Sequence, residues 1–421
     1  MKTLDFASLF AGAGGLDLGL EEAGWRCLYA SDIDPAAVAT LETSRGLPLA
    51  NGTGKAFQDT FIEQADVRQL SGKEILSKAG VRKGSVPLLA GGPPCQSWSS
   101  AGHQHGLRDP RGQLFADFVR IAAEMDVRWI VFENVRGLLT ARGPDGKPGT
   151  ALELIRKRLL AAGFQTTVSL LNAADYGVPQ RRVRLFIIGY REGDEPPFPV
   201  PTHFKASGLA DQGCIPWMTL GNCLQALSPI TEEEIIRPKG KMAEELKNIQ
   251  PGSGVKSPGK KERTRPGGHW GYKQGGFVAD LSLASRTVTA SGQQDWVRDP
   301  KLGLRRLCPR ECAAIQTFPD NWGWAGRNSV RYRLIGNAVP PLLAKAVGEA
   351  LAKHVWASDT APSKKATASS GQLAPLPSNL EAAISYTMRE EKSNGESRRM
   401  APSKRKSKID LAASLPRCCE G

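Results

Sequence analysis

The residue types best suited to covalent chemistry in this chain surround Cys95. A short apolar run at residues 86–90 has the length of a buried strand, and a Gly-Gly-Pro-Pro segment follows at residues 91–94. The glycines allow a tight turn and the prolines fix the backbone direction, so we predict a rigid loop just past a strand end. In open α/β sheets that edge collects ligands and reactive groups. We therefore predict that Cys95 is a nucleophile; the alternative is a small buried hydrophobe.

A glycine-rich turn near the N-terminus predicts a nucleotide-like ligand. A predicted strand at residues 4–10 runs into the Gly-Ala-Gly-Gly segment 12–15, and a helix-compatible stretch follows. Glycines let the backbone approach a ligand closely at a helix N-terminus. The next predicted strand, residues 26–30, is soon followed by Asp32, which lies about 20 residues beyond the glycines, where an acid can accept hydrogen bonds from ribose hydroxyls. The alternative for Asp32 is a surface aspartate after a strand.

The charge balance indicates a polyanionic partner. The chain has 56 Lys and Arg against 42 Asp and Glu, a net charge of +14, which suits nucleic acid but also an acidic membrane surface. No apolar run reaches the length of a membrane span and no secretory signal is visible, so we expect a cytoplasmic protein. The eight cysteines form no Cys-x-x-Cys pair, and no further ligands accompany His103 and His105, so no metal site is predicted.

Six short segments, in order along the first 350 residues, resemble the DNA cytosine-5 methyltransferases, a bacterial family that depends on S-adenosylmethionine. They are residues 10–15 (Phe-Ala-Gly-Ala-Gly-Gly), 92–96 (Gly-Pro-Pro-Cys-Gln), 132–135 (Phe-Glu-Asn-Val), 180–184 (Gln-Arg-Arg-Val-Arg), 306–312 (Arg-Leu-Cys-Pro-Arg-Glu-Cys) and 336–340 (Gly-Asn-Ala-Val-Pro). Each segment is short, so the resemblance rests on their number and their order.

The resemblance implies a catalytic group of Cys95, Glu133, Arg182 and Arg184. Addition of the Cys95 thiolate to carbon 6 of cytosine would activate carbon 5 for methylation. Glu133 would hold a proton for ring nitrogen 3; a surface acid is the alternative. Arg182 and Arg184 alternate along one predicted strand and face the same side, where they would bind the base oxygen, orient Glu133 and lower the thiol pKa. One of the two arginines could instead pair only structurally.

The resemblance also implies a site for S-adenosylmethionine. Phe10 would lie against the adenine ring, Asp32 would bind the ribose and Asp66 would accept from the adenine amino group. The chain departs from some members at Ile33, where an aromatic residue can stack, and in a long glycine-rich insertion at residues 44–60. The implied cofactor-binding residues are Phe10, Gly12, Gly14, Gly15, Asp32, Ile33, Asp66, Leu114 and Asn337.

Alternating strand-like and helical stretches predict an α/β fold. We expect a Rossmann-like methyltransferase sheet with helices on both faces, built on a parallel sheet, plus a smaller loop-rich target-recognition domain. The expected boundaries are 1–198 for the catalytic domain, 199–329 for the recognition domain and hinge, 330–356 for a returning helix, and 357–421 for a disordered basic tail.

Double-stranded DNA is the expected partner of the second domain. Residues 237–273 hold ten Lys or Arg against three Glu, interleaved with aromatic side chains, which suits contact with a groove. Residues 99–113 carry the glycines that a closing loop would use as hinges. A restriction endonuclease acting on the same DNA sequence could accompany the enzyme, which we expect to be a monomer.

Three other functions stay open at this point. A tRNA cytosine methyltransferase would share the chemistry, but its distinctive Cys-Phe-Thr element is absent from this chain. A nucleotide-binding oxidoreductase would explain residues 1–34 but not the later segments. A catalytically inactive DNA-binding protein has no need of Cys95, Glu133, Arg182 and Arg184 together.

Overall fold

The computed structural model describes residues 4–94, 110–191, 193–205, 215–256, 258–259, 276–359 and 372–397. Cys95, most of the expected closing loop at 99–113 and residues 260–275 of the basic stretch lie outside the described residues. Within the described ranges the chain forms a larger domain around a seven-stranded sheet and a smaller domain of short strands.

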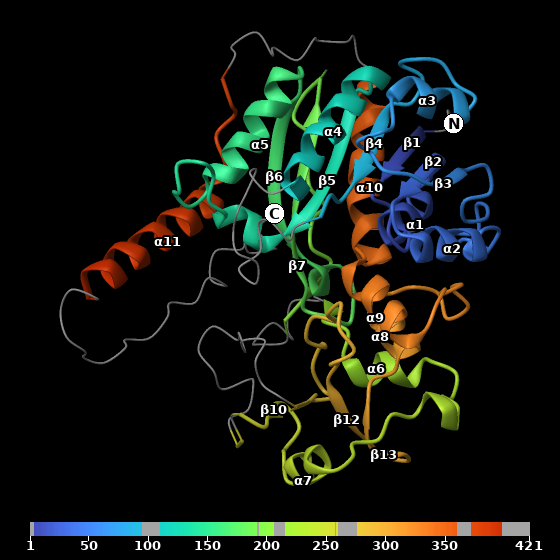
Figure 1. Cartoon of the computed structure of the whole chain (residues 1–421), viewed down its shortest axis with the longest axis vertical. Coiled ribbons are helices and arrows are strands. Elements are labelled where there is room, and N and C mark those ends of the chain that lie inside the picture. The colour runs from blue at the N-terminus through green and yellow to red at the C-terminus, as the bar shows by residue number, and fades with distance from the viewer. Residues whose placement is uncertain are drawn as a thin grey trace.

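The seven-stranded sheet at the centre of the larger domain has the strand order β3-β2-β1-β4-β5-β7-β6 (Figure 1). Its strands are β1 (Leu4–Leu9), β2 (Trp25–Asp32), β3 (Phe61–Gln64), β4 (Leu88–Gly91), β5 (Trp129–Val135), β6 (Gln165–Asn172) and β7 (Val183–Tyr190). The sequence predicts a parallel sheet. This prediction is wrong for β7, which runs antiparallel to β5 and β6. Only the short 3₁₀ helix η3 (Ala173–Tyr176) and a turn join β6 to β7. A parallel pair would need a longer crossover.

Helices cover both faces of this sheet, as predicted. On one face lie α1 (Gly15–Glu22), α2 (Pro35–Ser44) and α10 (Pro341–Asp359); on the other lie α3 (Gly72–Lys78), α4 (Pro110–Met125) and α5 (Thr150–Ala161). Neighbouring residues of a strand serve opposite faces, so Leu88 of β4 joins one apolar cluster and Leu89 the other. Both faces are therefore buried, which explains the apolar strand sequences.

The smaller domain is built on short strands and loops. Its sheet, in the order β10-β11-β12-β13, comprises β10 (Ser253–Gly254), β11 (Phe277–Val278), β12 (Trp296–Asp299) and β13 (Gly303–Arg306). The other elements of this region are β8 (His203–Phe204), β9 (Ile215–Pro216), α6 (Leu220–Gln225), η5 (Glu232–Glu234) and α7 (Lys241–Lys247). Leu246, Ile249, Val278 and Trp296 form a small apolar cluster of their own.

The chain returns to the larger domain earlier than the expected boundary at residue 330. Helix α8 (Pro309–Ile315) already contributes Ile315 to the apolar cluster of the central sheet. The indole Nε1 of Trp322 donates to the carbonyl oxygen of Ala13 at 3.2 Å, which ties this return to the glycine turn. The single returning helix expected over residues 330–356 is two helices, α9 (Asn328–Asn337) and α10. They break at Ala338, which is extended, just before Pro340 and Pro341.

Part of the expected disordered tail is ordered. Helix α10 continues to Asp359, and residues 378–397 form α11 (Ser378–Ser397). Leu380, Ala383 and Ile384, at helical spacing, give α11 an apolar stripe that packs on the larger domain. The surrounding polar composition concealed this stripe. Among the described helices, none has the length and apolarity to cross a membrane.

Candidate active site

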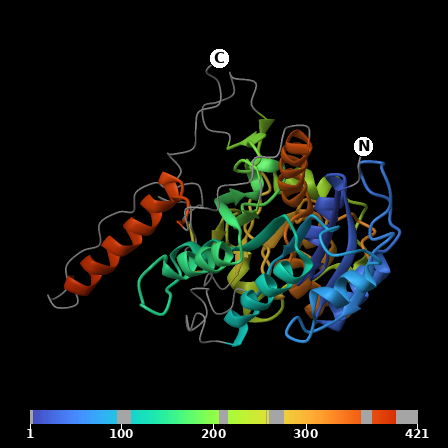
Figure 2. The ribbon, with the colours of Figure 1, turned by 90° about the horizontal axis from the view of Figure 1, so that it is seen from above.

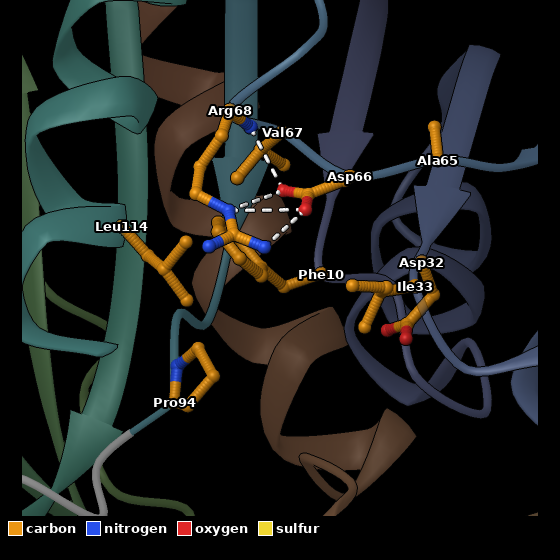
Figure 3. Close-up of a pocket in the computed structure, with 9 residues that line it drawn as sticks. All are labelled: Phe10, Asp32, Ile33, Ala65, Asp66, Val67, Arg68, Pro94 and Leu114. Atoms are coloured by element: carbon orange, nitrogen blue, oxygen red, sulfur yellow. Dashed lines mark hydrogen bonds and ion pairs between the residues drawn. The ribbon is translucent and has the colours of Figure 1, made fainter. Parts of the chain in front are cut away.

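A cavity of about 280 Å³ lies at the carboxyl ends of β1, β2 and β3 (Figure 3). It brings together five of the residues predicted to bind the cofactor and four that were not among the predicted cofactor-binding residues. The five are Phe10, Asp32, Ile33, Asp66 and Leu114, and the four are Ala65, Val67, Arg68 and Pro94. The four additional residues follow β3 and β4 directly, so strand ends were the signal that could have found them.

Asp32 is held rigidly at the end of β2. Its Oδ2 accepts from the amide of Gly12 at 2.8 Å, and its Oδ1 accepts from the amide of Asp34 at 2.8 Å. Burial raises the pKa of this carboxyl group, although the amide donors partly offset the effect. These two bonds fix the direction of the carboxyl group beside the cavity, where it can accept hydrogen bonds from vicinal hydroxyls.

The glycines of the turn are required for close packing. Gly14 has a φ of +80°, and a Cβ there would lie 2.9 Å from Cζ of Phe57. A Cβ on Gly15 would lie 2.1 Å from the carbonyl oxygen of Val339. Phe57 belongs to the glycine-rich insertion, so the insertion packs directly against the glycine turn. Asn337 is exposed and does not line the cavity, whereas Val339 from the same segment contacts the turn.

The other end of the cavity is polar at Asp66. The Nε of Arg68 lies 2.9 and 3.0 Å from the two carboxylate oxygens of Asp66, and this guanidinium lowers the pKa of the carboxyl group. Ile33, with 60% of its surface exposed, lines the cavity from the loop after β2. Figure 3 shows Phe10 between Leu114 and Ile33, with Asp66 above it. The cavity thus combines apolar walls with one carboxylate at the β2 end and another at the β3 end.

Glu133 and Arg184 form a buried ion pair beside this cavity. The Nε of Arg184 lies 3.1 Å from Oε1 of Glu133, and both side chains are largely shielded from solvent. Burial raises the pKa of Glu133, while the charges of Arg184 and Arg182 act in the opposite direction. Glu133 is thus a carboxyl group whose pKa is raised by burial and which a cation holds in place.

The loop that leads to Cys95 is attached to the end of β5. The amide Nδ2 of Asn134 donates to the carbonyl oxygen of Pro93 at 3.1 Å. A Cβ on Gly92 would lie 3.1 Å from Oε2 of Glu133, so the backbone passes directly beside the acid. Pro94, the next residue, lines the cavity. The chain therefore reaches the residue before Cys95 at a point between Glu133 and the cavity.

Arg182 is fully buried and bound to backbone carbonyls. Its Nη1 donates to Val288 at 3.1 Å, and its Nη2 donates to Gly336 and Ala338, each at 2.8 Å. These carbonyls belong to the smaller domain and to the end of α9. The placement fits the structural alternative for one of the two arginines, and Arg184 is the one that pairs with Glu133.

The described cysteines are poor candidates for a nucleophile. Burial raises the pKa of the Cys27 and Cys312 thiols well above the ordinary value, and raises those of Cys223 and Cys308 to about 12. Such thiols carry almost no thiolate at neutral pH. In the described part of the chain, no group of three His, Cys, Asp or Glu residues could hold a metal ion.

Comparison with known proteins identifies the family. A family model of the C-5 cytosine-specific DNA methylases matches residues 4–353. Type II methyltransferase M1.HphI of Haemophilus parahaemolyticus is 31% identical over 354 residues, which cover 83% of this chain and 87% of that protein. Type II methyltransferase M.NgoPII of Neisseria gonorrhoeae is 31% identical over 353 residues, or 82% and 94%. The chain therefore belongs to the C-5 cytosine-specific DNA methylase family and is a DNA (cytosine-5-)-methyltransferase.

Solved structures agree on the fold. A mutant of Spodoptera frugiperda DNMT2 superposes with a TM-score of 0.56 at 19% identity, covering 83% of this chain and 99% of that one. At this identity the likeness supports the sheet and its helical layers alone.

Two buried carboxyl groups lie on α1, next to the glycine turn. Burial raises the pKa of Asp17 to about 7, although the hydroxyl group of Ser8 lowers it somewhat. Burial also raises the pKa of Glu21 to about 8, and its oxygens accept from the amide of Phe57 at 3.0 and 3.3 Å. Helix α1 therefore carries two carboxyl groups that gain or lose their protons close to neutral pH.

Replacing Asp17 with Asn is expected to change how stability depends on pH. The folded protein keeps the Asp17 proton to about pH 7, whereas the ordinary pKa is 3.8, so this stabilisation is complete below pH 3.8 and is lost as the pH rises through 7. Relative to wild type, Asp17→Asn should gain roughly 4 kcal/mol between pH 4 and pH 8. Chemical denaturation across this range measures the gain. Asp59→Asn, at an exposed carboxylate, is the control, and an equal pH dependence in both variants would contradict the assignment.

Replacing Arg184 with Gln should shift the pH profile of methyl transfer. Because the charge of Arg184 lowers the pKa of Glu133, its removal should raise that pKa further. The pH at which Glu133 gives up its proton and activity is lost should then move to a higher value, while the rate constant falls by about tenfold to a hundredfold. Single-turnover methylation of DNA across pH 6–10 provides the measurement. Arg191→Gln, just past the other end of β7, is the control; an unshifted profile would argue against the pair.

Proposed function

We propose that this chain transfers a methyl group from S-adenosylmethionine to carbon 5 of a cytosine flipped out of a specific duplex sequence, through a covalent adduct with Cys95. The observation that carries the proposal is the course of residues 92–94. Gly92 passes Glu133, Pro93 is bonded to Asn134, and Pro94 lines the cavity. The next residue is Cys95. The course of the backbone therefore supports a nucleophile that lies near both Glu133 and the cavity.

The residues have complementary tasks in this proposal. The Cys95 thiolate forms a bond to carbon 6 of the base, and the electron pair of the 5,6 double bond moves towards carbon 5 and the ring. Glu133 stabilises that charge by donating a proton to ring nitrogen 3, which its burial favours. Arg184 orients Glu133 and favours the thiolate through its charge. Once carbon 5 carries its new methyl group, loss of the carbon 5 proton to solvent, cleavage of the sulfur–carbon bond and return of the ring nitrogen 3 proton to Glu133 restore the base and free the Cys95 thiolate.

The cavity fits the proposed cofactor. Its apolar walls at Phe10, Ile33 and Leu114 suit a flat heterocycle, Asp66 suits an exocyclic amino group, and Asp32 suits ribose hydroxyls. When bound, S-adenosylmethionine supplies an electrophilic methyl group on a sulfonium centre. Pro94 lies on the wall of the cavity that leads to Cys95, which supports delivery of that methyl group beside the nucleophile.

Duplex DNA is the proposed substrate, with the smaller domain as its reader. Carbon 6 of a stacked base is out of reach, so the target base must leave the duplex. The larger domain contains the cavity and the Glu133–Arg184 ion pair, which serve the cofactor and the chemistry. Residues 202–300 therefore remain to contact base edges. The similarity to type II methyltransferases supports a role in protecting DNA from a restriction endonuclease that acts on the same sequence.

Cys95→Ser is expected to abolish methyl transfer while leaving binding intact. A serine hydroxyl stays protonated near neutral pH, whereas a few per cent or more of a cysteine thiol is thiolate. Transfer of tritium from labelled S-adenosylmethionine to DNA should fall by at least a thousandfold, with cofactor affinity within twofold of wild type. Cys223→Ser, at a thiol whose pKa is raised, is the matched control. Turnover of Cys95→Ser within tenfold of wild type would remove Cys95 as the nucleophile.

Exchanging residues 202–300 should move the target sequence. If base edges are read by the smaller domain, the segment of a relative with known specificity should bring its own methylated sequence. Bisulfite sequencing of DNA from cells that express the chimera reports the result. Deleting residues 398–421, which lie beyond α11, serves as the control and should leave the target sequence unchanged. A chimera that keeps the original target would show that the reader lies elsewhere.

A further inference from the structure

We propose that residues 372–397 act as a strut that positions Glu133 and Asn134 through the loop after β5. This C-terminal strut lies beyond the family match, which ends at residue 353. It rests on the role proposed above for Glu133. The loop in question, residues 136–149, is called the return loop here because it leads the chain from β5 back to α5.

The return loop starts directly after the reactive end of β5. Its first turn is the 3₁₀ helix η2 (Arg136–Thr140), which begins three residues after Glu133. The carbonyl oxygen of Ala141 accepts from the amides of Gly149 and Ala151, at 3.1 and 3.3 Å, and so closes the loop onto α5. Only Asn134 and Val135 separate η2 from Glu133 along the backbone, so a movement of η2 would also displace Glu133.

The strut packs on the return loop through apolar side chains. Leu380 is 2% exposed and shares an apolar cluster with Leu138 and Leu139 of η2. At Gly149, where φ is +86°, an added Cβ would lie 2.9 Å from Cγ2 of Ile384. The two ends of the return loop are thus covered by neighbouring turns of α11.

Polar contacts hold the beginning of the strut. Arg156 of α5 is almost fully buried; its Nε donates to the hydroxyl group of Thr166 at 3.0 Å, and its Nη2 donates to the carbonyl oxygen of Ala374. The amide Nε2 of Gln165 donates to the carbonyl oxygen of Gln372 at 3.5 Å. A buried guanidinium that loses an acceptor is costly, so these bonds favour one docked position.

The first part of α11 lies against the body of the protein, and its far end points away from it (Figures 1 and 2). Ser385 is exposed, on the side of the helix away from the apolar stripe. The helix therefore has one face for docking and another on which Ser385 serves as a control.

The consequence for the site concerns how well Glu133 is shielded. The pKa of Glu133 is raised by burial. A looser return loop would admit water to this carboxyl group and misplace it with respect to the base. The proton would then be lost at lower pH, and small displacements of reacting groups can cost on the order of a hundredfold in rate.

The test is a set of single substitutions in the full-length enzyme. Ile384→Ala and Leu380→Ala should lower the single-turnover rate constant of DNA methylation by about tenfold or more. They should also lower the pH at which activity is lost through deprotonation of Glu133, while the affinity for S-adenosylmethionine stays within twofold. Ile384→Leu should restore both rate and profile, and the control variant Ser385→Ala should match wild type.

Two results would overturn the strut. One is a lower unfolding temperature for Ile384→Ala with an unchanged rate and pH profile, which would assign the segment to stability alone. The other is a slower rate with no change in the pH at which activity is lost, which would show that the segment does not act through Glu133. Ile384→Ala is the milder change and decides the matter if Leu380→Ala does not fold. Failure of the proposed function would be distinguishable, because the wild-type enzyme itself would then leave carbon 5 unmethylated.

Discussion

The hydrogen bond from Asn134 to the carbonyl oxygen of Pro93 joins the two halves of the site. One half is the acid at the end of β5, and the other is the loop that follows β4. A buried bond of this kind contributes about 1 kcal/mol to stability, and its larger effect is geometric. A Cβ on Gly92 would lie 3.1 Å from Oε2 of Glu133, so a larger residue there would require the acid to shift slightly. The parallel pairing of β4 with β5 brings these two strand ends to the same edge of the sheet.

The remaining elements can be understood as supports for that edge. Arg184 comes from the antiparallel strand β7 and holds Glu133, whereas Arg182 binds one carbonyl of the smaller domain and two at the end of α9. The glycine turn is packed between Phe57 of the insertion and Val339 of the segment before α10. Parts of the chain that are distant in sequence thus converge on two adjacent places, the cavity and the acid.

Much of this arrangement could be predicted from local sequence. The strands, the glycine turn and the position of Asp32 follow from apolar runs and the residues that end them. The positions of Phe10, Asp66 and Leu114 around the same cavity follow from the family resemblance. The partners of Arg182 could not be predicted, because they lie more than 100 residues away along the chain. The direction of β7 was missed because strands alternating with helices predict a parallel sheet throughout, whereas only η3 and a turn lie between β6 and β7. The α11 stripe was missed because few apolar residues carry it within a polar region.

The most direct test is to trap the adduct itself. Duplex DNA that carries 5-fluorocytosine at the target position, identified by bisulfite sequencing, is incubated with the enzyme and S-adenosylmethionine. Fluorine cannot leave as a cation, so the sulfur–carbon bond should persist after the methyl group is transferred. Digestion and mass spectrometry should then find the modified base, with its added methyl group, on the peptide that contains Cys95. An adduct on another residue, or its absence from DNA that the enzyme methylates when ordinary cytosine is present, would contradict the account.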